Sequence, residues 1–531
     1  MVVTADGLPN DVETLKRTVE VQAKELEARA KELEARAKEV ELLREHVRLL
    51  LSRLYGRKSE QMVANADVQQ LLLFAAGVLP VQEQTEEKAA EVQIPPHTRR
   101  KGGRQPLPEH LPRVEILHDL PETDKVCGCG ATKARIGEEV SEQLDIIPAS
   151  FQVLRHVRPK YACRQCEGTG DDSAPTVAIA PPPAQLIPKS IASAGLVAHV
   201  IIAKFADSIP LYRQEGQFAR HGVEIGRATM CGWLMKTADA CVPLLQLLRQ
   251  EILSGPLVNG DETTLQVLDE PGRAPTTDSY MWVFRGGQPE KPAVEFLYDP
   301  TRSSEVAAKY LRGFKGFVQT DGYVGYDFLD AQPGVIHVGC WAHARRKFMD
   351  VLKAAGNPSS GVAYDSVERI RQLYAIEKTA RQKNLTREEL CAVRQELAKP
   401  LLESFHDWLS DRALETPPKG LLGKAISYTL QQWHRLKKYI DNGLLQLDNN
   451  AAENAIRPFV VGRKNWLFSG TPEGATASAA FYSLIETAKA NQLEPYWYLR
   501  YVFGRLPVAT SEEDYRVLLP QYIDRSVLQQ S

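Results

Sequence analysis

The chain has 531 residues, of which 43% are hydrophobic and 25% charged, the composition of an ordinary globular protein with about three or four domains. A formal net charge of −2 means that any nucleic-acid contact must come from local basic patches. The N-terminus lacks the apolar core of a signal peptide, and the most apolar run, residues 192–206, is too short to span a bilayer. These features predict a cytoplasmic protein and exclude a membrane protein.

Residues 11–55 carry a seven-residue repeat, in which residues 23–29 recur as residues 30–36. Apolar side chains return at every seventh position, and alanine fills most of the companion seam. The apolar series is Val19, Leu26, Leu33, Val40, Val47 and Leu54. This spacing predicts a coiled coil, a leucine zipper that joins chains into a homo-oligomer. The alternative is a single charged helix stabilised by local Glu–Lys and Glu–Arg pairs.

Residues 81–108 are rich in Glu, Gln, Lys and Pro and poor in apolar groups, which predicts a flexible linker. The linker contains a basic, glycine-containing arm, His97-Thr-Arg-Arg-Lys-Gly-Gly-Arg104. Its cations, Arg99, Arg100, Lys101 and Arg104, are of the type that lies along DNA phosphates or in a minor groove. A solvated linker explains the same composition.

Residues 109–180 hold two pairs of closely spaced cysteines, Cys127 with Cys129 and Cys163 with Cys166. The strand-like segments 139–147 and 151–157 lie between them. Two cysteine knuckles joined by a hairpin predict a zinc-finger-like domain with a structural Zn²⁺. The first pair is a C-x-C, which is tighter than the usual C-x-x-C. The alternatives are therefore a fold without metal or one that uses only some of these ligands.

Residues 185–250 read as helices, and residues 213–234 follow the pattern of a helix-turn-helix. Ala219 is the small residue expected at the helix contact, Gly222 makes the turn, and Val223 is expected to be buried. The second helix is poor in base-reading side chains, and Arg227 and Thr229 are its main candidates. An ordinary helical hairpin is the alternative.

The segment 256–345 alternates between strand and helix patterns. A helix is expected at 303–312, and strands are expected at 257–267, 280–286, 293–299, 316–320 and 335–340. Three strands, a helix and further strands match a ribonuclease H-like sheet. In that sheet Asp261 lies on the first, central strand and Asp321 at the end of the neighbouring fourth strand, so their side chains can meet.

Residues 346–445 contain no strand pattern and predict an all-helical insertion in this α/β core. The core resumes at 446–490 with a helix, Asn449–Phe459, that bears Glu453, and a C-terminal segment follows at 491–531. The fold class expected is therefore a multidomain α+β protein with a ribonuclease H-like core interrupted by helices.

Asp261, Asp321 and Glu453 form the candidate site. Carboxylates cost free energy in a sheet core unless a cation compensates them, so two strands and a helix that each carry one suit a pair of Mg²⁺ (or Mn²⁺) ions. Two such ions catalyse in-line phosphoryl transfer. The alternative is three unrelated surface acids, because the chain contains 67 Asp and Glu residues.

Basic side chains accompany these acids. Arg345, Arg346 and Lys347 follow the last predicted strand, and Arg457, Arg463 and Lys464 follow Glu453, with Trp466 beside them. A cationic and aromatic strip next to a metal site suits a DNA end. A solvated basic face is the alternative, as is a structural role for Trp341 and His343.

Several longer motifs resemble the insertion sequence 66 family of bacterial transposases. They are Glu139-Val-Ser-Glu-Gln-Leu-Asp145, His156-Val-Arg-Pro-Lys-Tyr-Ala-Cys163, Thr320-Asp-Gly-Tyr-Val-Gly-Tyr326, Gly339-Cys-Trp-Ala-His-Ala-Arg-Arg-Lys-Phe348, Asp448-Asn-Asn-Ala-Ala-Glu-Asn-Ala-Ile-Arg-Pro458 and Gly462-Arg-Lys-Asn-Trp466. The resemblance covers nearly the whole chain. One departure is the first knuckle, where the family usually has C-x-x-C.

The resemblance implies a DDE transposase with Asp261, Asp321 and Glu453 as its catalytic triad. Such an enzyme binds the ends of its insertion sequence, cleaves and joins DNA strands, and acts with companion proteins of the same element. It would be cytoplasmic, and on the bacterial nucleoid when bound. Two rival hypotheses remain, a DNA-binding regulator without catalysis and a ribonuclease H-like nuclease that cuts without joining.

Overall fold

The computed structural model describes residues 12–55, 115, 150–162 and 177–528. Residues 80–159 separate from the rest of the chain as a second unit. The basic arm of the linker and the four clustered cysteines lie outside the described residues, so the predictions made for them stay predictions. Among the described helices, none has the length and apolar character needed to cross a membrane.

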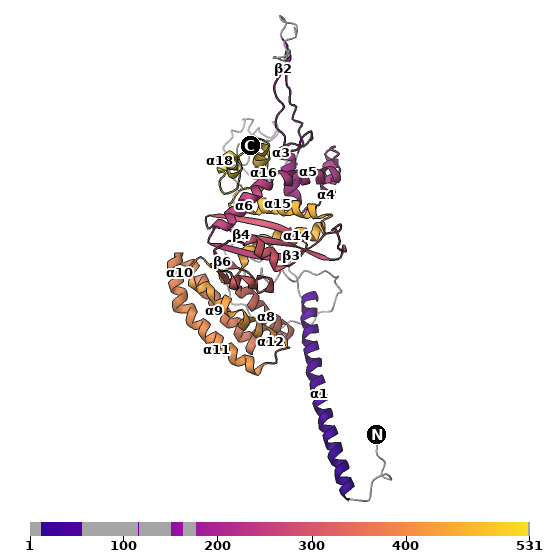
Figure 1. Ribbon diagram of the computed structural model, residues 1–531, viewed down its shortest axis with the longest axis vertical. Helices are drawn as coiled ribbons and strands as arrows, with labels where there is room; N and C mark the ends of the chain where they lie inside the picture. The colour runs from indigo at the N-terminus through magenta and orange to yellow at the C-terminus, as the bar shows by residue number, and fades with distance from the viewer. Residues whose placement is uncertain (1–11, 56–114, 116–149, 163–176, 529–531) are drawn as a thin grey trace, which may run out of the picture. The chain divides into compact units, whose positions relative to one another are not determined.

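A five-stranded mixed sheet forms the centre of the described structure, in the order β5-β4-β3-β6-β7 (Figure 1). The strands β3, β4 and β5 pair antiparallel, whereas β6 and β7 continue from β3 in parallel. Their bounds are Leu257–Gln266, Asp278–Gln288, Lys291–Asp299, Gly316–Gln319 and Val335–Val338. All five predicted strands are confirmed, as is the predicted helix, which is α7 (Ser304–Tyr310).

Helices cover both faces of this sheet. On one face the ring of Phe284 stacks on Tyr310 of α7 at a centroid distance of 3.8 Å, and Arg249 of α6 (Val242–Ser254) pairs with Glu295 at 2.7 Å. The next residue of β5, Phe296, points to the other face, because side chains alternate along a strand. There it meets Phe459 of α14 (Asn450–Trp466) and Tyr482 of α15 (Pro472–Ala490).

The predicted insertion is entirely helical between Trp341 and Asp441 and has its own apolar core (Figure 1, orange). Its elements are α8 (Trp341–Ala354), α9 (Val362–Gln382), α10 (Arg387–Val393), η4 (Arg394–Ala398), α11 (Lys399–Glu415), α12 (Leu421–Gln431), α13 (Trp433–Leu436) and η5 (Lys437–Asp441). The chain then re-enters the sheet domain as α14. The insertion therefore separates Asp321 from Glu453 in sequence without a long irregular loop.

The repeat region forms one helix, α1 (Val12–Tyr55), as predicted. Val19, Leu26 and Leu33 of the apolar seam are more than 60% exposed in this single chain. Pairs four residues apart, such as Lys31 with Glu27 at 2.7 Å, stabilise the isolated helix. Self-association through the exposed seam stays a prediction.

Helices α3 (Ala194–Phe205), α4 (Leu211–Arg220) and α5 (Arg227–Ala240) confirm the predicted helical region. Gly222 makes the turn between α4 and α5 with a φ of 73°. The role assigned to Ala219 is wrong, because this residue is exposed and the adjacent Phe218 is buried in its place. The helix turns every 3.6 residues, so neighbouring positions face different sides, and the bulkier residue enters the core. Val223, expected to be buried, is half-buried.

The strand predicted at 151–157 is also wrong. Residues 151–159 are exposed and form no ladder, and Val153 is 92% exposed. The strand begins later, at β1 (Lys160–Ala162), which pairs antiparallel with β2 (Val177–Ile179). Alternation of apolar and polar residues supports a strand only where one face is covered.

The core of the insertion contains a buried ion pair between Arg394 and Glu377. Both nitrogens Nε and Nη2 of Arg394 lie 2.8 Å from the carboxylate of Glu377, and the guanidinium also donates to the carbonyls of Tyr439, Asn442 and Leu445.

Replacing Arg394 with Ala leaves Glu377 as an uncompensated buried charge and should lower the free energy of unfolding by about 3–5 kcal/mol. Urea denaturation followed by circular dichroism measures the change. Arg371→Ala, which removes an exposed partner of Glu368 on α9, is the control and should cost less than about 1 kcal/mol. Equal effects of the two substitutions would contradict this assignment.

Candidate active site

Asp261 and Asp321 are brought together by the parallel pairing of β3 with β6. The ladder matches Leu257 with Phe317 and Asn259 with Gln319. Continued by two residues, this register sets Asp261 on the central strand beside Asp321, which lies two residues after the end of β6 and whose charge acts on Asp261. Each aspartate has one oxygen held by a backbone N–H at 2.9 Å, from Glu262 and Tyr323 respectively. The sheet therefore presents two adjacent carboxylates at one point.

Glu453 reaches this point because the start of α14 is tied to β3. The amide nitrogen Nδ2 of Asn449 donates to the carbonyl of Gly260 at 2.9 Å, and Asn259 donates to Oδ1 of Asn449 at 3.0 Å. Asn449 is buried, as is Glu453 one turn later. The asparagine therefore fixes the helix end next to Asp261 and aims the first turn of α14 at the two aspartates.

The three carboxylates interact electrostatically. Burial raises the pKa of Asp261 well above its usual value, and the charges of Glu262, Asp321 and Glu453 raise it further. Burial likewise raises the pKa of Asp321 and of Glu453. Like charges in a partly dry site disfavour ionisation, and a bound cation would relieve that cost. The structure thus brings all three predicted acids into one electrostatic cluster.

A fourth acid, Glu262, belongs to the same cluster and was not predicted. Its side chain is 1% exposed, and burial followed by the charge of Asp321 raises its pKa. Arg302 donates to Glu262 through Nε at 2.8 Å, and the Tyr326 hydroxyl donates to it at 2.8 Å. Adjacent strand residues usually point to opposite faces, so strand alternation does not predict that both acids share one site.

Cys340, His343 and Glu453 offer ligand atoms that all lie within 4.8 Å of one another. Oε1 of Glu453 and Nδ1 of His343 are 3.6 Å apart, and both are buried with no hydrogen-bond partner among the described residues. Buried polar atoms are normally satisfied, so this pair marks a place where a further group fits. Trp341 has the structural role given as the alternative, since its indole nitrogen donates to the carbonyl of Leu436 at 2.9 Å in the insertion core.

The basic side chains divide into two groups. Arg346 and Arg457 act on the acids, because their charges lower the pKa that burial raises at Glu453. Arg463 instead donates to the hydroxyls of Thr263 and Thr264 at 3.3 and 3.1 Å.

Of the remaining cations, Lys347 also acts on the acids, because its charge offsets part of the rise that burial causes in the pKa of Asp321. Lys464 is exposed on α14, Arg345 is half-buried on α8, and Lys347 places its ammonium 4.3 Å from the ring centre of Tyr428. Arg227 is exposed at the start of α5, apart from this cluster in the sequence.

The described core is a mixed sheet with helices on both faces and with a cluster of acids around its central strand β3. The Transposase IS66 family model matches residues 189–477, which is more than half of the chain. Models of the zinc-finger binding domain of transposase IS66, of the transposase C of IS166 homeodomain and of the IS66 C-terminal element match residues 124–167, 42–116 and 483–521. The chain therefore belongs to the Transposase IS66 family, whose members are DDE transposases, and the predicted family is confirmed.

Three proteins of Sinorhizobium fredii are similar to this chain, and each carries the name "Uncharacterized protein". The protein y4jD is 35% identical over 428 residues, which is 78% of this chain and 81% of y4jD. The protein y4hP is 30% identical over 482 residues, or 86% and 84% of the two chains. The protein y4qI is 33% identical over 424 residues, or 77% and 76%. The likeness thus extends well beyond the catalytic segment.

The raised pKa of Asp261 has a measurable consequence for stability. The folded state holds the proton more tightly than the unfolded state, so the metal-free fold loses stability as the pH rises above the unfolded-state pKa, and the loss is complete once the pH exceeds the folded-state pKa. Asp261→Asn removes that charge. We expect it to stabilise the metal-free protein by about 1–2 kcal/mol at alkaline pH, and the gain should vanish near about pH 4, where the wild-type carboxyl is neutral.

Melting temperatures measured across this pH range in metal-free buffer check this prediction. Asp411→Asn, at an exposed position on α11, is the control and should change little at any pH. A less stable Asp261→Asn variant at alkaline pH would show that the carboxylate is not under electrostatic stress.

Proposed function

We propose that this protein binds the ends of its insertion sequence, cleaves the DNA there and transfers the freed strand to target DNA, with Asp261, Asp321 and Glu453 as its catalytic residues. The observation that carries this proposal is the register of β3 and β6, which sets Asp261 beside Asp321 and within electrostatic reach of Glu453. The strand order β5-β4-β3-β6-β7 supports a ribonuclease H-like core, and family membership supports the transposase activity.

The donor set fits divalent cations. Asp261, Asp321 and Glu453 supply the hard oxygen ligands that Mg²⁺ or Mn²⁺ prefers, and Oε1 of Glu453 accepts no hydrogen bond from the residues that the structure describes. When bound, two such cations activate an attacking hydroxyl and stabilise a leaving oxygen. His343 lies beside Glu453 and fits a role in holding its carboxylate.

The chain's own cations complete the site. Arg302 lies 3.7 Å above the ring centre of Tyr323 and is paired with Glu262, so it is held over the loop that follows Asp321. Arg346 and Arg457 lie within electrostatic range of Glu453 and are suited to bind the phosphates of a DNA end. Arg345 and Lys347 extend this basic strip along α8, and Lys464 extends it along α14.

Three further elements belong to the proposal. The exposed seam of α1 fits self-association into a homo-oligomer, and the match to a zinc-finger domain supports Zn²⁺ at Cys127, Cys129, Cys163 and Cys166. Arg99, Arg100, Lys101, Arg104 and Arg227 are proposed DNA contacts outside the catalytic core. Companion proteins of the same element remain proposed partners.

The catalytic assignment is tested with Glu453→Gln, which keeps the size of the side chain and removes its charge. We expect loss of Mg²⁺-dependent cleavage and strand transfer by at least about 10³-fold, while binding to labelled element ends stays unchanged. Glu473→Gln, at an exposed position on α15, is the matched control and should retain activity.

Product analysis on a gel separates the rival functions. Joined products from the wild type support the transposase. Cut ends without joining identify a nuclease, and specific end binding without chemistry identifies a regulator. Full strand transfer by Glu453→Gln would remove Glu453 from the site.

The basic strip is tested by two neighbouring substitutions on α14. Lys464→Ala should weaken binding to DNA of any sequence and reduce the slope of log affinity against log salt by about one, as expected for one lost phosphate contact. Arg463→Ala should instead lower the melting temperature, because Arg463 is bonded to β3. Fluorescence anisotropy at several salt concentrations measures the slopes. An unchanged slope for Lys464→Ala would place the DNA elsewhere.

A further inference from the structure

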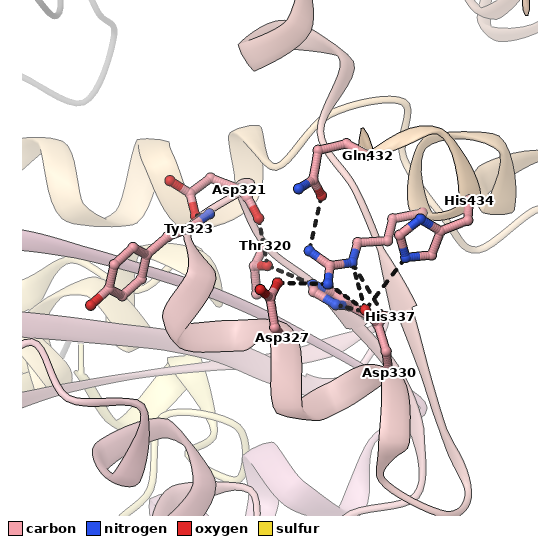
Figure 2. A network of polar contacts seen from close by, with 9 residues as sticks. Thr320, Asp321, Tyr323, Asp327, Asp330, His337, Gln432 and His434 are labelled. Carbon is pink, nitrogen blue, oxygen red and sulfur yellow. Dashed lines mark hydrogen bonds and ion pairs between the residues drawn. The ribbon is translucent and has the colours of Figure 1, made fainter. Parts of the chain in front are cut away.

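A chain of polar contacts connects the helical insertion to the residue before Asp321 (Figure 2). It begins at Arg435 on α13, passes through Asp330 on η3 (Val324–Ala331) and His337 on β7, and ends at Thr320. Asp330 is the acid shared by Arg435 and His337. Arg435 is 105 positions from Asp330 in the sequence, so the insertion brings a distant residue to this loop.

The geometry at the Asp321 end is closely defined. The Thr320 hydroxyl lies 2.9 Å from Nε2 of His337 and 2.9 Å from the carbonyl oxygen of Asp321. Burial lowers the pKa of His337 to about 4, so the ring is neutral at physiological pH. The hydroxyl donates its single hydrogen to the Asp321 carbonyl, its oxygen faces Nε2 of His337, and Nδ1 of the same ring lies 3.2 Å from Asp330. The hydroxyl is therefore fixed by β7 immediately before Asp321.

The insertion end is held by charge. Nε of Arg435 lies 3.0 Å from Oδ2 of Asp330, and its Nη2 lies 2.6 Å from Oδ1 of Asp327. Arg435 is buried, whereas the two aspartates are partly exposed on η3. A planar guanidinium that grips two carboxylates sets orientation as well as distance. The position of α13 is thus transmitted to η3 and from there to His337.

A nucleophilic role for Thr320 does not fit. A hydroxyl, an imidazole and a carboxylate in series can activate a nucleophile, but Thr320 is 0% exposed and His337 is 5% exposed. No substrate atom can reach the hydroxyl without opening the sheet. The arrangement is therefore one that positions a neighbouring residue.

The insertion holds the same loop at a second place. The hydroxyl of Tyr428 on α12 packs against Gly322, a contact that leaves no room for a side chain at position 322. A Cβ atom at position 322 would lie 2.5 Å from that hydroxyl. Asp321 is consequently flanked by two residues, Thr320 and Gly322, that are both connected to insertion helices.

We propose that the helical insertion positions Asp321 for cation binding, through Arg435, Asp330, His337 and Thr320 on one side and through Tyr428 and Gly322 on the other. This inference rests on the proposed function, because it assumes that Asp321 is a cation ligand. These are positioning residues, since none of them ligates the cation. Their loss should weaken the cation site more than it weakens the fold.

The test compares Thr320→Val with Thr320→Ser in the full-length protein. Valine keeps the shape of threonine and removes the hydroxyl, whereas serine keeps the hydroxyl. We expect Thr320→Val to weaken Mn²⁺ binding, measured by isothermal titration calorimetry, by about three- to tenfold, the effect of one hydrogen bond. The Mg²⁺ concentration for half-maximal DNA cleavage should rise by the same factor, and Thr320→Ser should behave as the wild type.

A second pair tests the insertion end. Arg435→Gln should weaken Mn²⁺ binding in the same way, whereas His434→Gln should not, although His434 touches the same Asp330 at 3.4 Å from the exposed side. Tyr428→Phe, which removes only a hydroxyl, tests the second connection. If circular dichroism shows that Thr320→Val is unfolded, Arg435→Gln and Tyr428→Phe still test the positioning role.

Asp321→Asn distinguishes a failure of the positioning role from a failure of the proposed active site. If it abolishes Mn²⁺ binding while Thr320→Val, Arg435→Gln and Tyr428→Phe bind as the wild type does, the positioning role is refuted and the proposed active site stands. If Asp321→Asn leaves Mn²⁺ binding unchanged, Asp321 is not a ligand, and the positioning role falls with the site.

Discussion

The rest of the core depends on one electrostatic constraint, the burial of several carboxylates at one point of a sheet. Asp261, Glu262, Asp321 and Glu453 repel one another and lose hydration, so burial raises the pKa of each. Neighbouring groups offset only part of this cost. Arg302 neutralises Glu262, and Arg346 and Arg457 act on Glu453 from outside the sheet. The remaining unfavourable charge is what a divalent cation would stabilise, so binding of the cation and stability of the fold are linked at this point.

The helical insertion divides the core in the sequence, but in the structure it packs as a unit that contacts the sheet domain. The insertion has a separate apolar core, with Arg394 and Glu377 buried inside it. It nevertheless contacts both sides of the loop at Asp321 through Arg435 and Tyr428. Membership of the Transposase IS66 family and the clustering of acids agree on the chemistry, and the helical insertion adds a means of aligning one of those acids.

Much of the core was predictable because its signals are local. Runs of β-branched and apolar residues identified all five strands, and heptad spacing identified the long helix α1. The acids Asp261, Asp321 and Glu453 could be selected because each lies in such an apolar element, where a charge needs a reason. Local signals failed where burial decides the outcome. The alternating segment 151–157 is exposed and forms no strand, and Ala219 faces solvent while Phe218 enters the core.

The sequence by itself determined the family, the strand and helix types of the core, and the three acids most suited to a cation. Only the tertiary structure decided that Glu262 shares their site, that Cys340 and His343 lie against Glu453, and that Arg435 is connected to Thr320. The physical reason is the separation along the chain over which each kind of interaction acts. Hydrophobic period and turn chemistry act between near neighbours in the chain, whereas hydrogen bonds and charge pairs form between any residues that the fold brings within a few ångströms of each other.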